Sequence, residues 1–109
     1  MAVSMVKGVL ATYTNDTYTE LLQAGVDKTL IVRMLNIHNT TSGAITVSVE
    51  IADNTDSPIA VLLSNYSLAA YNTLTYGPND LFLVLSDQEK IMAKASAAGV
   101  NFVAGGGEE

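Results

Sequence analysis

The chain has 109 residues and a mass of 11.5 kDa, which is enough for one folded domain with one hydrophobic core. Only 15% of the residues are charged, well below the roughly 25% of an average soluble domain. The five lysines and arginines are scattered and the net charge is −6, so the clustered cations that bind nucleic-acid backbones are missing. Cysteine is absent, which removes disulfides, thiolate metal sites and cysteine nucleophiles.

Two segments in the middle of the chain carry the clearest strand patterns. Residues 45–51 alternate between apolar and polar side chains, which is the signature of a strand with one buried face. Residues 29–39 begin with an apolar run, and Arg33 interrupts the series before Leu35 and Ile37 resume it. A short polar loop with Gly43 joins the two segments. This arrangement predicts that they pair as a β-hairpin around a central strand.

Shorter strands are predicted on both sides of this hairpin. The first covers residues 2–12, with a bulge or bend at Gly8. The others cover residues 17–24, 59–68, 71–76, 81–85, 90–97 and 100–104, and the apolar run 81–85 is expected to be buried. About eight short strands at roughly 10-residue spacing indicate an all-β chain folded as an antiparallel β-sandwich, with a jelly roll as one form of it. A helix is the alternative for residues 18–23 and 88–98.

The sandwich domain is expected to end at residue 104. Residues 1–104 would then form a single domain, and the three glycines and two glutamates of residues 105–109 would form a flexible, acidic tail. The first residues lack the pattern of a signal peptide. Apolar runs of about five residues are far shorter than the roughly 20 residues that cross a bilayer, so no membrane partner is expected.

No combination of residues predicts catalysis. His38 is the sole histidine, so the partners of a zinc site or a hydrolase set are missing. The acidic loop 53–56 begins like a calcium loop, but Pro58 and Ser64 stand where an EF-hand needs a glycine and an acidic ligand. We therefore expect no enzyme activity, no cofactor and no metal site. His38 is interpreted as a strand residue at a polar surface or a subunit contact.

Residues 24–103 resemble small β-sandwich virion proteins of tailed bacteriophages. The likeness begins with Ala24-Gly25 and Lys28-Thr29, continues through the apolar series of residues 31–37 into Asn39-Thr40, and includes residues 44–49. Residues 67–70 and 95–102 resemble the C-terminal half of that group. His38 stands where these proteins often have a cysteine, a position that would be structural.

The resemblance implies a structural virion protein, in the first place a capsid decoration (cement) protein that binds the outer capsid surface and stabilises the head. Its implied partners are the major capsid protein and further copies of itself in a homotrimer, with assembly in the host cytoplasm. The N-terminal strand and the glycine-rich tail are the expected contact arms. The expected interface residues are Val3, Met5, Lys7, His38, Tyr66, Tyr71 and Tyr76.

Two other classes of function compete with this one. A neck, tail or fibre component with a receptor- or glycan-binding role would use Tyr18, Tyr66, Tyr71 and Tyr76 as stacking faces, if their rings gather in an exposed groove. Otherwise the five tyrosines, Tyr13 included, cap the sandwich core with their hydroxyls in water. An enzyme would need a nucleophile, a base and an orienting group around the single histidine, and the sequence does not offer them.

Overall fold

The computed structural model describes residues 3–13 and 16–109, and within these residues all regular structure is β-strand. The nine strands are β1 (Ser4–Tyr13), β2 (Thr19–Gln23), β3 (Thr29–Asn39), β4 (Ile45–Ala52), β5 (Pro58–Leu68), β6 (Thr73–Tyr76), β7 (Leu83–Ser86), β8 (Lys90–Ala95) and β9 (Val100–Glu108). Strands β2 and β8 occupy the two segments for which a helix was the alternative, so that alternative is wrong. No helix that is long and apolar enough to span a membrane occurs in the described residues.

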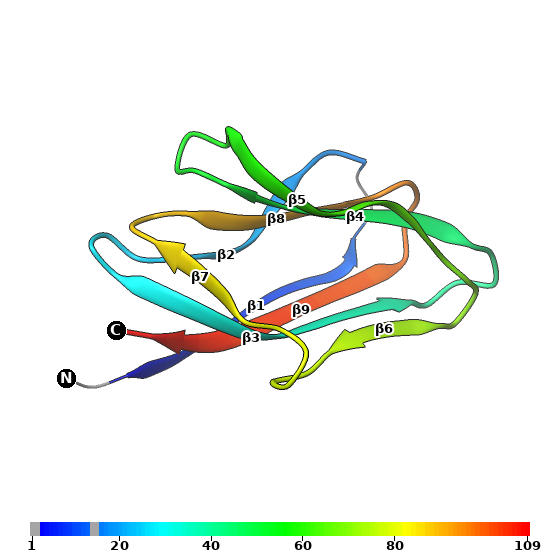
Figure 1. The fold of residues 1–109 in the computed structure, drawn as a ribbon. Helices are drawn as coiled ribbons and strands as arrows, with labels where there is room; N and C mark the ends of the chain where they lie inside the picture. Colours follow the sequence, from blue (N-terminus) through cyan, green and yellow to red (C-terminus); the bar gives the residue numbers. More distant parts are fainter. Residues whose placement is uncertain (1–2, 14–15) are drawn as a thin grey trace.

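The strands form two antiparallel sheets that face each other (Figure 1). The five-stranded sheet has the order β1-β9-β3-β6, and β7 pairs with the first half of β3 on the same edge as β6. The four-stranded sheet has the order β2-β8-β4-β5. The first strand thus pairs with the last, the second with the one before the last, and β4 with β5. This wrapped pairing is a jelly roll, which confirms the predicted antiparallel β-sandwich.

The hydrophobic core lies between the two sheets, and β3 supplies much of one wall. A β-bulge shifts the pairing of β3 with β9 at Arg33 and resets the alternation of side chains. Leu30 and Val32 before the bulge and Leu35 and Ile37 after it therefore all face the core and are buried. The irregular series that Arg33 interrupts in the sequence has this physical cause. The opposite wall consists of buried side chains that include Leu22, Val47, Val49, Ile91 and Ala93.

The predicted hairpin between residues 29–39 and 45–51 is wrong in its pairing, although both strands exist. Strand β3 belongs to the five-stranded sheet and β4 to the four-stranded sheet, so the loop between them crosses from one layer to the other. Strand β3 already has β9 on one edge and β6 with β7 on the other, and β4 lies between β8 and β5. Alternation in a sequence shows which side chains are buried but not which strand lies beside which.

The crossing is held by the side chain of Asn39, which is fully buried. Its amide Nδ2 donates to the carbonyl oxygens of Gly43 (2.8 Å), Leu68 (3.0 Å) and Ala69 (3.3 Å). Its Oδ1 accepts from the backbone N–H (2.9 Å) and the hydroxyl (2.7 Å) of Thr41. One side chain therefore joins the end of β3, the crossing loop and the end of β5.

Replacing this side chain should destabilise the protein selectively. Asn39→Ala leaves buried carbonyl groups without donors, and we expect it to lower the free energy of unfolding by about 2–3 kcal/mol. Asn36→Ala is the control, since Asn36 is only half-buried and donates one side-chain hydrogen bond, to the Thr75 hydroxyl (3.2 Å). We expect Asn36→Ala to lower the free energy of unfolding by less than about 1 kcal/mol. Chemical denaturation measures both, and equal losses would show that the crossing does not depend on Asn39.

The glycine-rich segment at the C-terminus is not a tail, which corrects the predicted boundary at residue 104. Residues 105–108 form the second half of β9 and pair with β1 on one edge and β3 on the other. The N-terminal segment is likewise an ordered strand, with Ser4 opposite Glu108. The two chain ends therefore lie beside each other in one sheet (Figure 1), and neither is a free contact arm within the described residues.

Two glycines in these strands are required by close backbone approach. A Cβ added to Gly106 would lie 1.9 Å from the backbone oxygen of Ile31, and one added to Gly8 would lie 1.8 Å from that of Leu21 in the other sheet. The predicted bulge at Gly8 is wrong, because Gly8 pairs in regular register with Ala104 and the shift falls between Leu10 and Tyr13. Glycine composition alone does not distinguish a flexible tail from a crowded central strand.

Gly106→Ala should therefore destabilise the protein, because the backbones of β9 and β3 must separate to admit the Cβ. We expect a loss of about 1–3 kcal/mol or more in the free energy of unfolding. Gly43→Ala is the matched control, since a Cβ there meets no atom within 4 Å. Thermal and urea unfolding of both variants measure the difference. A fully stable Gly106→Ala variant would restore the interpretation of residues 105–109 as a tail.

Candidate functional site

The outer face of the five-stranded sheet, the side away from the core, carries large apolar side chains in water. One row across the sheet runs Met5–Gly107–Ile31–Val84, and the next runs Lys7–Gly105–Met34. Met5 is 82% exposed and Val84 is 49% exposed. Other exposed apolar side chains of this face are Val3, Val9 and Phe82. Large apolar side chains exposed together on one sheet face make it a candidate binding surface.

A groove runs along the middle of this outer face because β9 has no side chains there. Gly105 and Gly106 of β9 form its floor, so backbone lies between the side chains of β1 and β3. Gly107 lies outside the groove, and a Cβ added to it would be 2.8 Å from Val3 Cγ1. The groove has a volume of about 340 Å³, and its lining is almost wholly apolar. Its lining residues are Met5, Val6, Lys7, Arg33, Met34, Pro78, Gly105 and Gly106.

Two cations border this groove, one on each bank. Arg33 Nη2 donates to the backbone oxygen of Pro78 at 2.7 Å, and the guanidinium carbon lies 5.3 Å from the centre of the Phe82 ring. Lys7 is exposed and forms no ion pair with a described residue. The five strands of this sheet contain one carboxylate, that of Glu108. Glu108 pairs with Leu30, whose side chain faces the core, and its carboxylate accepts a hydrogen bond from the Gly25 N–H at 2.8 Å. The groove is therefore apolar with positive edges.

The outer face of the four-stranded sheet is different, because its polar groups satisfy one another. The Tyr18 ring lies beneath Lys94, with the Lys94 Nζ 4.7 Å from the ring centre. Burial raises the pKa of Tyr18 above its ordinary value, and the negative charge of Glu50 raises it further. Lys90 Nζ contacts Asp56 at 2.6 Å and Glu20 at 3.7 Å. Apolar side chains are exposed on this sheet as well, at Ile59 and Val61 of its edge strand β5.

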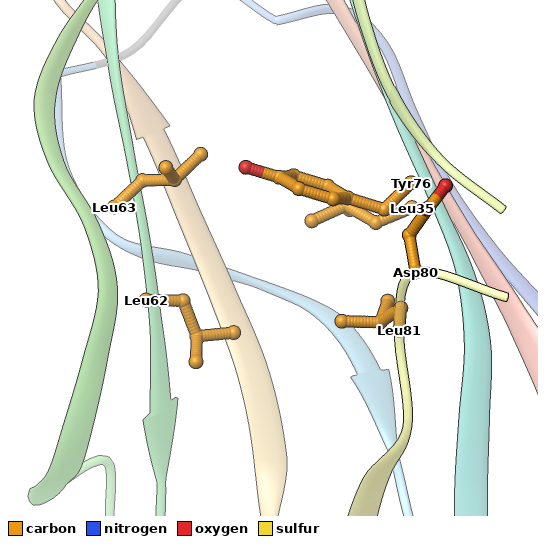
Figure 2. Close-up of a pocket in the computed structure, with 6 residues that line it drawn as sticks. All are labelled: Leu35, Leu62, Leu63, Tyr76, Asp80 and Leu81. Carbon is orange, nitrogen blue, oxygen red and sulfur yellow. The ribbon is translucent and has the colours of Figure 1, made fainter.

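A second hollow lies at the open edge of the sandwich, between β5 of one sheet and β6 of the other (Figure 2). It has a volume of about 200 Å³ and is lined by Leu35, Leu62, Leu63, Tyr76, Asp80 and Leu81. In Figure 2 the Tyr76 hydroxyl points across the hollow toward Leu63. Asp80 accepts a hydrogen bond from the Gly77 N–H at 3.1 Å, which fixes the turn at the rim. The hollow can receive an apolar group but assembles no acid–base pair.

The structure divides the seven predicted interface residues among several places. Val3, Met5 and Lys7 lie together on the outer face of the five-stranded sheet. His38 lies on the same face at the far end of β3, where its Nδ1 is 2.7 Å from the Thr73 hydroxyl. Tyr76 lines the hollow. The two remaining residues, Tyr66 and Tyr71, are exposed on β5 and in the loop after it.

Several residues of the groove escaped the sequence analysis. The run 81–85 was expected to be buried, but only Leu85 in it is buried, and Phe82 is 63% exposed. Because the run is wholly apolar, it carries no alternation signal that could have indicated that Phe82 and Val84 point outward. The rings of the glycan-binding alternative do not share one groove, since Tyr18 lies under Lys94 and Tyr76 in the hollow.

The acidic loop 53–56 uses its carboxylates for the turn and for an ion pair. Asp53 Oδ1 accepts from the Thr55 N–H (2.8 Å), the Thr55 hydroxyl (2.7 Å) and the Ser57 N–H (3.1 Å). Asp56 contacts Lys90. Across residues 3–13 and 16–109, no three His, Asp or Glu side chains converge as a metal site would require. These hydrogen bonds favour the carboxylate form and hold the pKa of Asp53 below its ordinary value of 3.8.

The described residues thus form a jelly-roll β-sandwich with exposed apolar side chains on one outer sheet face. Solved structures with the same fold are chains from infectious bursal disease virus. The chain in the T13 viral particle has a TM-score of 0.52 and 10% sequence identity, over 97% of this chain and 30% of the viral one. The chain in the VP2 subviral particle has a TM-score of 0.50 and 11% sequence identity, over 98% of this chain and 31% of the viral one. The chain from the Gx strain has a TM-score of 0.52 and 11% identity, over the same shares of the two chains.

This likeness establishes a viral capsid-like β fold. The chain spans less than a third of the length of those viral chains. No protein-family model and no curated protein matches the sequence. The fold agrees with the β-sandwich that the resemblance to virion proteins implies, and the virion role and the origin in a tailed phage stay predictions.

The Asp53 hydrogen bonds predict a pH-dependent contribution to stability. Since the folded-state pKa lies below 3.8, the carboxylate stabilises the protein above this value, and the stabilisation is lost as the pH falls through the folded-state pKa. Asp53→Ala should therefore lower the melting temperature at pH 6 and have little effect near pH 2. Thermal melts of both proteins across this range measure it. A difference that grows on acidification would contradict the assignment.

Proposed function

We propose that this chain is a non-enzymatic structural protein of a virus particle, and more closely a capsid decoration protein of a tailed phage. The observation that carries the proposal is the exposed apolar outer face of the five-stranded sheet on a viral capsid-like fold. A decoration protein needs a preformed, rigid contact surface, and a sheet pairing along β1, β9 and β3 supplies one. Its partner would be the major capsid protein at the outer surface of the head.

The mechanism of stabilisation follows from repetition. Each copy would bury part of its apolar face against the shell, and a contact of roughly 800 Å² per partner is sufficient for specific binding. Copies that bridge neighbouring capsomers would add contacts that must break before the shell can open. The proposal includes a homotrimer as the binding unit. Its interface retains the predicted residues, with Val3, Met5 and Lys7 toward the shell and His38, Tyr66, Tyr71 and Tyr76 as further contacts.

Addition of the purified protein to expanded, undecorated capsids of the same phage tests this function. Electron cryo-microscopy should show regular density at capsomer junctions. Met5→Asp should reduce binding by about tenfold or more, because a buried Met side chain contributes about 1.5–3 kcal/mol. Val61→Asp is the matched control, since Val61 is also exposed (58%) but lies on β5 of the other sheet.

Two results would contradict the proposal. Density confined to the portal vertex or the tail would identify a neck, tail or fibre component instead. A bare capsid surface under conditions where the protein is folded would remove the decoration function altogether.

A further inference from the structure

We propose that the groove over β9 binds an extended, acidic and apolar segment of the capsid shell protein. In this arrangement an apolar side chain of the segment lies over the glycine floor, and flanking carboxylates pair with Lys7 and Arg33. This inference rests on the proposed decoration function and adds the chemistry of the partner to it.

The charges of the groove select an acidic occupant. The protein carries a net charge of −6, yet the charged residues that line the groove are two cations. Neither cation forms an ion pair with a carboxylate of the described residues. On the other sheet, by contrast, Lys90 contacts the carboxylates of Asp56 and Glu20. Two cations left without counterions at an apolar surface are complementary to carboxylates supplied by a partner.

The shape of the groove selects an extended segment. Gly105 and Gly106 are consecutive residues of β9, so the floor that they form runs along the strand direction. The side chains of Met5 and Lys7 on β1 form one bank, and Met34 and Arg33 on β3 form the other. A volume of about 340 Å³ accommodates large apolar side chains carried on a strand-like backbone.

A second copy of this chain is a poorer occupant. Contact between the same faces of two copies would place the cations of one groove near those of the other, which is unfavourable. The groove itself is lined by no carboxylate, since Glu108 accepts from Gly25 on the inner side, and Glu109 pairs with Thr29 beyond the groove lining. The partner must therefore bring its carboxylates from a different surface.

Co-sedimentation of the protein with undecorated capsids, over a range of salt concentrations, measures the role of charge. Lys7→Glu should weaken binding by about tenfold or more and remove much of its salt dependence, and Lys7→Arg should retain binding. Lys28→Glu is the matched control, because it makes the same change in net charge at an exposed lysine of the β2–β3 turn, which does not line the groove. Circular dichroism confirms that each variant is folded.

Carbodiimide, which joins a lysine directly to a contacting carboxylate, identifies the partner on the decorated capsid. We expect a cross-link from Lys7 to an Asp or Glu that neighbours apolar residues in the shell protein. Decoration with equal binding of Lys7→Glu and Lys28→Glu, or with Lys7 joined only to another copy of this chain, would overturn the inference and leave the decoration function standing. Absence of wild-type binding would overturn both.

Discussion

The central position of β9 is the constraint on which the five-stranded sheet depends. It pairs along its length with β1 and β3, and it brings the last residues of the chain beside the first. At Gly106 the backbones approach so closely that no other residue fits without displacement. In the same stretch of the strand, Gly105 and Gly106 form the floor of a groove on the outer face. The run of glycines therefore lets β9 pair closely with its neighbours and also leaves the groove on the outer face without side chains from β9.

Much of the secondary structure could be predicted from the sequence, whereas the pairing could not. The bounds of residues 29–39 were correct because β-branched and apolar residues fill that strand between clear polar boundaries. Pairing was misassigned because the strand that completes the edge of β3 lies far along the chain, at residues 100–108. Asn39 shows why the local signal misled, since an Asn-Thr-Thr-Ser-Gly loop suits a tight turn and also suits a crossing between layers.

The exposed apolar face of the five-stranded sheet was only partly predictable for a related reason. Val3, Met5 and Lys7 were identified from their place on a terminal strand, and the structure shows that they share a face. Phe82 and Val84 belong to an apolar run, and such a run does not reveal whether both sides of its strand are covered. Here only the inner face of β7 is covered, by the core, so Leu85 is buried while Phe82 and Val84 remain exposed to water.

The two outer faces of the sandwich differ in a way that bears on solubility as well as binding. The four-stranded sheet surrounds its polar residues with partners from its own chain, and this leaves little free energy to gain from a new contact. The five-stranded sheet keeps apolar side chains in water, and neither Lys7 nor Arg33 pairs with a carboxylate of the described residues. Burial of this face would remove apolar surface from water and pair its charges in a single step. The same features make an isolated copy prone to non-specific association, which the net charge of −6 opposes by repulsion between copies. The net negative charge thus makes copies of this protein repel one another, while the cationic, apolar face can still attract a partner of complementary charge.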